Sequence, residues 1–196
     1  MKAITIFDDE EYLRQSSKAV DIVNDKEISK DIATLKQFCM ENDAYAMAAI
    51  QLGINKRILY VCAPTPDVKQ KDESLHFVMI NPIVLEQSGK TTFWEACVSC
   101  FPYCSLVERP YKMKIKYYTP QGEETIRDFE GFVCTVLSHE LDHFDGVFHM
   151  DRALKTISCT KDERKELRKK EPYTIIRTDG EFKYAPIIEK INYNSL

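Results

Sequence analysis

The segment from residue 131 to 144 constrains this chain most, because it is apolar along one side and carries two histidines four residues apart. The spacing predicts a helix on which His139 and His143 lie one turn apart, on nearly the same face. Two imidazoles in this arrangement can bind one divalent metal ion, and Glu140 of the H-E-x-x-H motif would lie beside it, ready to handle the proton of an activated water. The alternative is that both histidines satisfy buried polar groups on a core helix, which would leave Glu140 as an unexplained charge.

A metalloenzyme site of this kind needs a third protein ligand and one open position. The third ligand could be His149, an acid or a cysteine. His149 follows His143 by only six residues. In the metzincin pattern the third histidine follows a glycine and lies further from the second histidine, so His149 does not match that pattern. Cys97 follows a Glu-Ala pair, and its thiolate could complete a tetrahedral Cys-His-His set. A separate structural zinc on Cys97, Cys100 and Cys104 is the competing interpretation, although this cluster lacks a second ligand pair at finger-like spacing.

Composition and charge exclude several other classes of protein. The chain has 27 Lys and Arg against 31 Asp and Glu, and its net charge of −4 does not suit a protein that wraps nucleic-acid phosphates. Its longest apolar runs, at 44–50 and 132–137, are far shorter than the roughly 18 residues that span a bilayer. The N-terminus has no apolar signal region and is too acidic for a transit peptide. We therefore expect a cytoplasmic protein without membrane contact or sequence-specific nucleic-acid binding.

The chain has seven cysteines, an odd number, and no secretory signal. This combination predicts reduced thiols rather than a disulfide framework. We expect Cys39 and Cys134 to pack as small hydrophobes, and Cys100 and Cys104 to be thiols that lie near the site without a role in it.

Hydrophobic periodicity predicts an α+β fold, in which antiparallel β-sheets pack around the central helix that carries the H-E-x-x-H motif. Residues 18–40 favour a helix with room for a break after Val23. Residues 161–171 favour a charged, solvated helix, with a docking element for a large anionic partner as the alternative. Two glycine-containing turns predict hairpins, one around Ser88-Gly89 and one around Asp179-Gly180. Further elements are predicted as strands over 57–63, 75–81, 111–118 and 123–129, with a loop over 64–73.

Three stretches of the chain, taken in order, resemble the signatures of the peptide deformylase family. The family patterns are G-x-G-x-A-A-x-Q, E-G-C-x-S and H-E-x-D-H, and the matching stretches lie at 44–51, 95–99 and 139–143. The resemblance runs over most of residues 1–155, which predicts a catalytic domain of that length and an extension over 156–196. Family analogy suggests that such an extension can aid docking on the ribosome.

The resemblance implies removal of the formyl group from N-formylmethionyl nascent polypeptides. It implies a ferrous ion, for which zinc, nickel or cobalt can substitute, held by Cys97, His139 and His143. By the same match, Glu140 is the general acid and base. The Gln51 side chain and the Val98 backbone N–H would donate hydrogen bonds to the developing oxyanion.

Residues of the substrate pocket are predicted from the same match. Tyr45, Phe132 and Val136 would line an apolar pocket for the methionine side chain, with plain core packing as the alternative reading. Three glycines of the family patterns, next to which the peptide would lie, are alanines here: Ala44, Ala46 and Ala96. If the backbone needs a positive φ there, each alanine costs about 1 kcal/mol; if the peptide runs against it, each methyl narrows the cleft.

Two other functions use parts of the same pattern. A zinc endopeptidase shares H-E-x-x-H, but a thiolate as third ligand would weigh against it. A catalytically weakened relative that binds peptide N-termini without turnover is the second alternative, and the three alanines motivate it.

Overall fold

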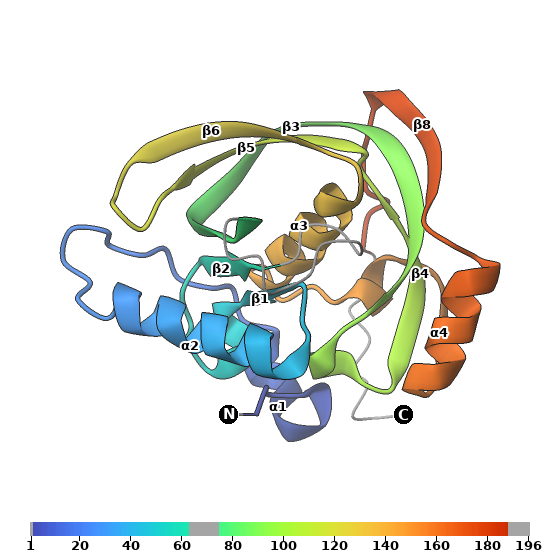
Figure 1. The fold of residues 1–196 in the computed structure, drawn as a ribbon, viewed down its shortest axis with the longest axis horizontal. Helices are drawn as coiled ribbons and strands as arrows, with labels where there is room; N and C mark the ends of the chain where they lie inside the picture. Colours follow the sequence, from blue (N-terminus) through green and yellow to red (C-terminus); the bar gives the residue numbers. More distant parts are fainter. Residues whose placement is uncertain (1, 63–74, 188–196) are drawn as a thin grey trace.

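The computed structural model describes residues 2–62 and 75–187, and over this part the chain has an α+β fold, as predicted (Figure 1). An antiparallel sheet of eight strands runs β1-β2-β3-β4-β7 along its main path, with β5 and β8 also paired to β3 and with β6 paired to β5. The loop predicted over 64–73 lies outside the described residues. The helices are α1 (Ile6–Leu13), α2 (Ile28–Asn42), α3 (Phe132–His143) and α4 (Lys161–Lys170), with short 3-10 turns η1 (Ala49–Leu52), η3 (Val98–Cys100) and η4 (His149–Arg152). The strands are β1 (Ala46–Ala48), β2 (Ile58–Val61), β3 (Phe77–Ala96), β4 (Tyr103–Arg109), β5 (Lys112–Tyr118), β6 (Glu124–Glu130), β7 (Ala153–Ser158) and β8 (Thr174–Glu181).

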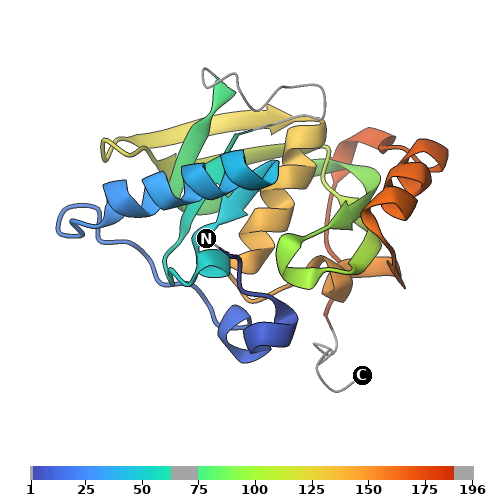
Figure 2. The ribbon, with the colours of Figure 1, turned by 60° about the horizontal axis from the view of Figure 1, so that its bottom comes forward.

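Helix α3 runs through the middle of the molecule, beneath the curved strands in Figure 1 and beside the end of α2 in Figure 2. It begins after Gly131, whose φ of 82° is a backbone conformation that glycine adopts at little cost. Phe132, Val136 and Leu137 on α3 are buried in one cluster with Ile115 of β5 and Leu59 of β2. This packing fixes the direction in which the polar residues at the C-terminal end of α3 point.

Strand β3 is one continuous strand of 20 residues, so the hairpin predicted around Ser88-Gly89 is wrong. Gly89 does have a positive φ, of 71°, but it lies at a register irregularity within β3 rather than at a chain reversal. A Cβ on Gly89 would lie 2.6 Å from Cβ of Tyr111 and 2.8 Å from the carbonyl oxygen of Arg177. The glycine therefore allows close contact with two neighbouring segments while the strand bends.

The second predicted hairpin, around Asp179-Gly180, is also wrong. Residues 174–181 form the single strand β8, which pairs antiparallel with residues 88–92 of β3. The chain then leaves the sheet, and Phe182 is buried. The β-forming residues on the two sides of the turn therefore find different partners, which a local turn signal cannot reveal.

The helix predicted over 18–40 is present only in its second half, as α2. Residues 18–27 form turns, because the side chain of Asn81 accepts a hydrogen bond from Val20 N–H at 2.8 Å and donates one to the Val20 carbonyl at 2.9 Å. Val23, which the helical spacing would place on the buried face, is 90% exposed. A long-range polar contact thus overrides the local apolar pattern.

One pair of cysteines departs from the predicted reduced state. Cys104 of β4 and Cys159, directly after β7, form a disulfide. In the β4–β7 register Cys104 faces Ile157, so Cys159 is its diagonal neighbour on the same side of the sheet. The parity of the cysteine count could not reveal this pairing, which depends on strand register.

Strands β7 and β8, which follow α3 in the chain, belong to the same sheet. Helix α4 is solvated as predicted and has no fully buried residue. No helix among the described residues combines the length and apolarity needed to cross a membrane.

Candidate metal centre and substrate cleft

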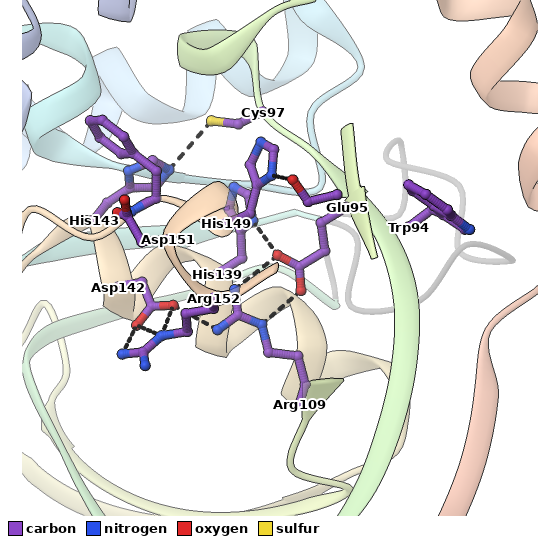
Figure 3. A network of polar contacts seen from close by, with 12 residues as sticks. Trp94, Glu95, Cys97, Arg109, His139, Asp142, His143, His149, Asp151 and Arg152 are labelled. Atoms are coloured by element: carbon purple, nitrogen blue, oxygen red, sulfur yellow. Dashed lines mark hydrogen bonds and ion pairs between the residues drawn. The ribbon is translucent and has the colours of Figure 1, made fainter. Parts of the chain in front are cut away.

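Helix α3 and the segment after β3 bring three potential metal ligands together (Figure 3). The Sγ of Cys97 and one ring nitrogen each of His139 and His143 lie within 4.8 Å of one another. The Cys97 Sγ lies 3.3 Å from His143 Nε2. A thiolate and two imidazoles at this separation can hold one divalent transition metal ion with a coordination position left open.

A carboxylate orients His139 from behind. The Nδ1 of His139 lies 2.8 Å from Glu95 Oε2, which leaves Nε2 to face the other two ligands. Arg109 binds Glu95 through two parallel hydrogen bonds, of 2.7 and 2.8 Å. Burial opposes the charged form of Glu95, but the Arg109 guanidinium and His139 hold its pKa below the ordinary value. Glu95 is therefore a carboxylate, which suits a hydrogen-bond acceptor for His139.

A second carboxylate on α3 completes this buried network. Asp142 accepts a hydrogen bond from Arg109 Nη1 at 2.6 Å, and Arg152 donates to both of its oxygens at 2.7–2.9 Å. Because Arg109 is 0% exposed, its charge depends on Glu95 and Asp142 for compensation. The network ties β3, β4, α3 and η4 together around the metal-ligand group.

The environment of Cys97 favours its thiolate. A hydrogen bond with the Cys100 thiol and the adjacent charge of His143 lower the pKa of Cys97 well below its ordinary value, although burial opposes this. The side chain of Gln51 also donates to the Cys97 Sγ at 3.1 Å. The alternative of a structural zinc on Cys97, Cys100 and Cys104 is wrong for this structure, because Cys104 is in the disulfide with Cys159.

Glu140 lies on the cleft side of α3, next to His139. Its Oε2 accepts a hydrogen bond from Ala48 N–H at 2.8 Å, which links α3 to β1. Burial raises the pKa of Glu140 above its ordinary value. A buried, positioned carboxyl of raised pKa is suited to take up and give back a proton.

His149 is not a member of the ligand group. Its ring stacks on that of His139, with centroids 5.7 Å apart, and its Nδ1 lies 2.8 Å from Ser105 Oγ. Burial and the charge of His139 lower the pKa of His149 to about 3, so its imidazole is neutral at neutral pH. Its role in the structure is to pack behind His139.

An open cleft of about 820 Å³ adjoins the ligand group. Of the residues predicted to serve the site, His143 is buried and does not line the cleft. The others all line it: Ala44, Tyr45, Ala46, Gln51, Ala96, Cys97, Val98, Phe132, Val136, His139 and Glu140.

The three alanines that replace family glycines do not need a positive φ. Among the described residues other than glycine, only Asp43 and Asn81 have one. Backbone strain is therefore not the consequence of Ala44, Ala46 and Ala96. All three alanines line the cleft, so the consequence that is left is a cleft narrowed by their methyl groups.

Several residues of the site escaped the sequence analysis. The compensation of Arg109 by Glu95 and Asp142 depends on contacts between residues far apart in the chain. The apolar rings of Phe7 and Phe101 and the cations of α4 also line the cleft. One local signal could have indicated a buried ion pair. Arg109 is a charged residue that stands directly before a proline, in a segment of strand residues.

The fold and this site together define a class: an α+β protein in which a cysteine and two histidines that could hold a metal ion adjoin an open cleft. The family model of polypeptide deformylase matches residues 1–158. The chain belongs to the polypeptide deformylase family, whose members are metal-dependent enzymes that act on nascent formyl-Met peptides.

Individual relatives agree with the family match. Peptide deformylase 1 of Clostridium perfringens is 36% identical over 148 residues, which cover 76% of this chain and 95% of the relative. Among solved structures, a peptide deformylase from Synechococcus elongatus in complex with actinonin has a TM-score of 0.69 and 28% identity, covering 87% of both chains. A Met-Ala-Ser-bound class I type b peptide deformylase from Acinetobacter baumannii has a TM-score of 0.68 and 27% identity, covering 78% of this chain and 97% of that one.

Proposed function

We propose that this chain removes the N-formyl group from N-formylmethionyl peptides by metal-dependent hydrolysis, with Cys97, His139 and His143 as the metal ligands. The observation that carries the proposal is the convergence of these three donor atoms within 4.8 Å of one another, beside an open cleft. Nascent chains are formylated where they are synthesised, so the proposal places the activity in the cytoplasm.

The donor set fits a transition metal. One thiolate and two imidazoles suit zinc and the divalent ions of iron, nickel and cobalt. We propose Fe²⁺ as the working metal, with Zn²⁺, Ni²⁺ and Co²⁺ as functional substitutes, following the family resemblance. When bound, the metal would supply a nucleophile at neutral pH by lowering the pKa of water from about 15.7 to around 7, and would polarise the formyl carbonyl.

Glu140 is the proposed proton carrier. Its carboxylate is adjacent in sequence to His139, is buried, and is held at one oxygen by Ala48 N–H. We assign to it the uptake of the proton of the attacking water and its delivery to the leaving amine of methionine. The hydrogen bond from Ala48 would keep the carboxylate in place through both transfers.

Gln51 and Val98 are the proposed donors to the oxyanion. The Gln51 side-chain amide lies next to the ligand group, where it donates to Cys97 Sγ and to Ser99 Oγ, both at 3.1 Å. Turning one of its two N–H bonds from Ser99 to the formyl oxygen would stabilise the negative charge that develops there. The Val98 backbone N–H, directly after Cys97, is the second proposed donor. Each such donor is worth about 3 kcal/mol by the oxyanion-hole precedent.

The proposed pocket for the methionine side chain is aromatic and apolar. The ring of Phe132 lies in edge contact with the rings of Tyr45 and Phe93, with ring centroids 5.9 and 5.0 Å apart. Val136 lies one turn further along α3 and lines the same cleft. The backbone around Ala44, Ala46 and Ala96 would run beside the bound peptide and pair with it as an added strand.

The extension over 156–196 has a proposed partner of its own. A ribosome contact through this segment would involve the exposed lysines of α4, such as Lys165 and Lys170, which do not line the cleft. Because the net charge of the chain is −4, we do not propose sequence-specific recognition of nucleic acid.

Hydrolysis of formyl-Met-Ala-Ser by the protein loaded with iron under anaerobic conditions tests the proposal. We expect release of formate and free Met-Ala-Ser, and no cleavage of an internal peptide bond. Cleavage within unformylated peptides would favour the zinc endopeptidase. Peptide binding without turnover, with the metal bound, would favour the weakened relative.

A further inference from the structure

One side of the cleft is lined by cations from α4, a helix whose polar sequence favours a solvated surface over a docking element. Lys161, Arg164 and Arg168 follow one another at spacings of three and four residues, and all three line the cleft. We refer to these three residues as the basic wall. Figures 1 and 2 both show α4 beside the strands near the end of β3, the strand that leads to Cys97.

Helix α4, which carries the basic wall, is attached to β3 through Arg168 and Glu171. Arg168 donates from Nε and Nη2 to the Trp94 carbonyl, at 2.9 and 2.7 Å, and its guanidinium carbon lies 4.5 Å from the centroid of the Phe93 ring. In return, the Trp94 indole N–H donates to Glu171 at the end of α4 at 2.8 Å. A charge that is positioned before the ligand arrives loses little conformational entropy on binding.

The structure shows no ion pair that compensates the basic wall within residues 2–62 and 75–187. Among the described residues, no carboxylate forms an ion pair with any of its three cations. Asp162 of α4 does not line the cleft, and the other acidic side chains of residues 161–171 have partners elsewhere: Glu163 with Thr160, Glu166 with Lys169, and Glu171 with Trp94.

The described acidic groups elsewhere in the cleft form no ion pair with the basic wall. Glu95 is engaged by Arg109 and His139, and Glu140 lies beside the metal ligands. Asp43 lines the cleft from the segment before β1, and the charge of Glu95, although engaged elsewhere, also acts on Arg168. Burial lowers the pKa of Arg164, and burial together with the charge of Arg164 lowers that of Arg168 to about 10. Both arginines therefore stay positive at neutral pH.

We propose that the basic wall selects formylated peptides with Asp or Glu in the positions that follow methionine. The inference rests on the proposed function, since it needs a peptide whose methionine lies in the Phe132 pocket near the ligand group. Residues after methionine would leave that pocket along Phe93 and Ala96 and reach the open side of the cleft, where the basic wall lies. A carboxylate there would supply the missing counter-charge in a partly desolvated setting.

The test compares two C-terminally amidated peptides, formyl-Met-Glu-Glu and formyl-Met-Gln-Gln, which differ in charge and hardly in shape. We expect a kcat/KM about threefold or more higher for the Glu peptide at low salt, carried by KM, since a partly exposed ion pair is worth a few-fold in affinity. The preference should weaken as salt rises, because the Debye length shrinks to about 8 Å at 0.15 M. Formyl-Met-Gln-Gln with a free C-terminal carboxylate shows whether the chain end can replace the acidic side chain.

Variants of α4 connect the preference to the basic wall. In the double variant Lys161→Gln/Arg164→Gln the Glu-to-Gln ratio should fall to about one, and Arg164→Glu should reverse it. Arg168 is left unchanged because it anchors the helix to Trp94. Lys165→Gln is the matched control, since Lys165 is on the same helix but does not line the cleft, and it should leave the ratio as it is.

Two further measurements separate the possible failures. If none of the peptides is hydrolysed, the proposed function fails, and calorimetric binding of the same peptides to the metal-loaded Glu140→Gln variant still measures the preference. A wild-type ratio of one, or a ratio unchanged in the double variant, overturns the inference. If the double variant loses ribosome binding while the ratio is unchanged, the basic wall serves RNA instead.

Discussion

Single residues at the metal centre act through contacts that cross the whole fold. Glu140 illustrates this, because its carboxylate is held by a backbone N–H from β1 while its neighbour His139 is held by Glu95 from β3. The proposed proton carrier and the proposed imidazole ligand are therefore positioned by different strands. Substitutions at these residues should separate metal binding from turnover.

Glu140→Gln should keep the metal and lose catalysis. Glutamine has nearly the same shape and can still accept the hydrogen bond from Ala48, but it cannot carry a proton. We expect kcat to fall by about 10²- to 10⁴-fold, with the metal content per chain unchanged. Measurement of both quantities on one preparation checks this, and full activity in the variant would remove Glu140 from its assigned role.

Arg109→Met should destabilise the fold strongly. The substitution would leave the buried carboxylate of Glu95 without its bidentate partner, which costs about 3–5 kcal/mol in comparable cases. Urea unfolding measures this loss. The double variant Arg109→Met/Glu95→Gln is the control, because it removes the orphaned charge and should recover part of the stability. Additive losses in the double variant would show that the pair is not coupled.

At the residue scale, sequence reasoning works where a chemical role demands a residue type. The H-E-x-x-H spacing and the Cys97 stretch bring forward the three side chains whose donor atoms converge in the structure. Sequence reasoning does not predict the Arg109 network or the basic wall. In those cases the residue types are ordinary, and only the tertiary contacts give them a meaning.

At the scale of elements, turns decide how α3 is joined to its neighbours. Gly146, shortly after α3, has a φ of 63°, and a Cβ at this position would lie 2.0 Å from the carbonyl oxygen of Arg14. The end of the metal-bearing helix is thus in direct contact with the chain that follows α1.

Gly146→Ala should therefore destabilise the protein. The methyl group would clash with backbone that has no flexible end to move, in addition to the cost of the positive φ, and we expect a loss of about 2 kcal/mol or more. Gly131→Ala is a suitable comparison, since it has a positive φ but nothing within 4 Å of the added Cβ, and should cost about 1 kcal/mol. Thermal unfolding measures the stability of the two variants. Equal losses of stability in Gly146→Ala and Gly131→Ala would contradict the predicted clash.

The predicted elements also show where local patterns stop being informative. The helix over 131–144 and the strands over 111–118 and 123–129 are confirmed as α3, β5 and β6. Strand β5 alternates between buried and less buried residues as its sequence predicts, and β6 is the return strand that pairs with it. Gly89 and Gly180 both have the positive φ that is typical of turn residues. The two predicted hairpins are nevertheless absent, because β3 and β8 each continue through the glycine and pair with each other. Strand partners far apart in the sequence decided these segments.

At the scale of the whole molecule, the C-terminal residues contribute to the sheet that surrounds the site. Strand β8 pairs with β3, and the Tyr184 ring covers the Arg152 guanidinium at 3.8 Å. The division into a catalytic domain over 1–155 and an extension over 156–196 stays a prediction.

Removal of the chain after residue 159 tests that division. The truncation would expose the β3 edge, the Phe93 ring and the Trp94 carbonyl that Arg168 now binds. We expect a lower melting temperature and loss of the preference for acidic peptides. A truncated protein with unchanged melting temperature would show that the first 159 residues form an independent catalytic unit.

The central claim is that one sulfur and two imidazole nitrogens hold the catalytic metal. X-ray absorption on the iron- or zinc-loaded protein measures this directly. We predict one sulfur at about 2.3 Å and two nitrogens at about 2.0–2.1 Å for zinc, with the sulfur contribution absent in Cys97→Ser. A wild-type metal shell that contains nitrogen and oxygen but no sulfur would contradict the account.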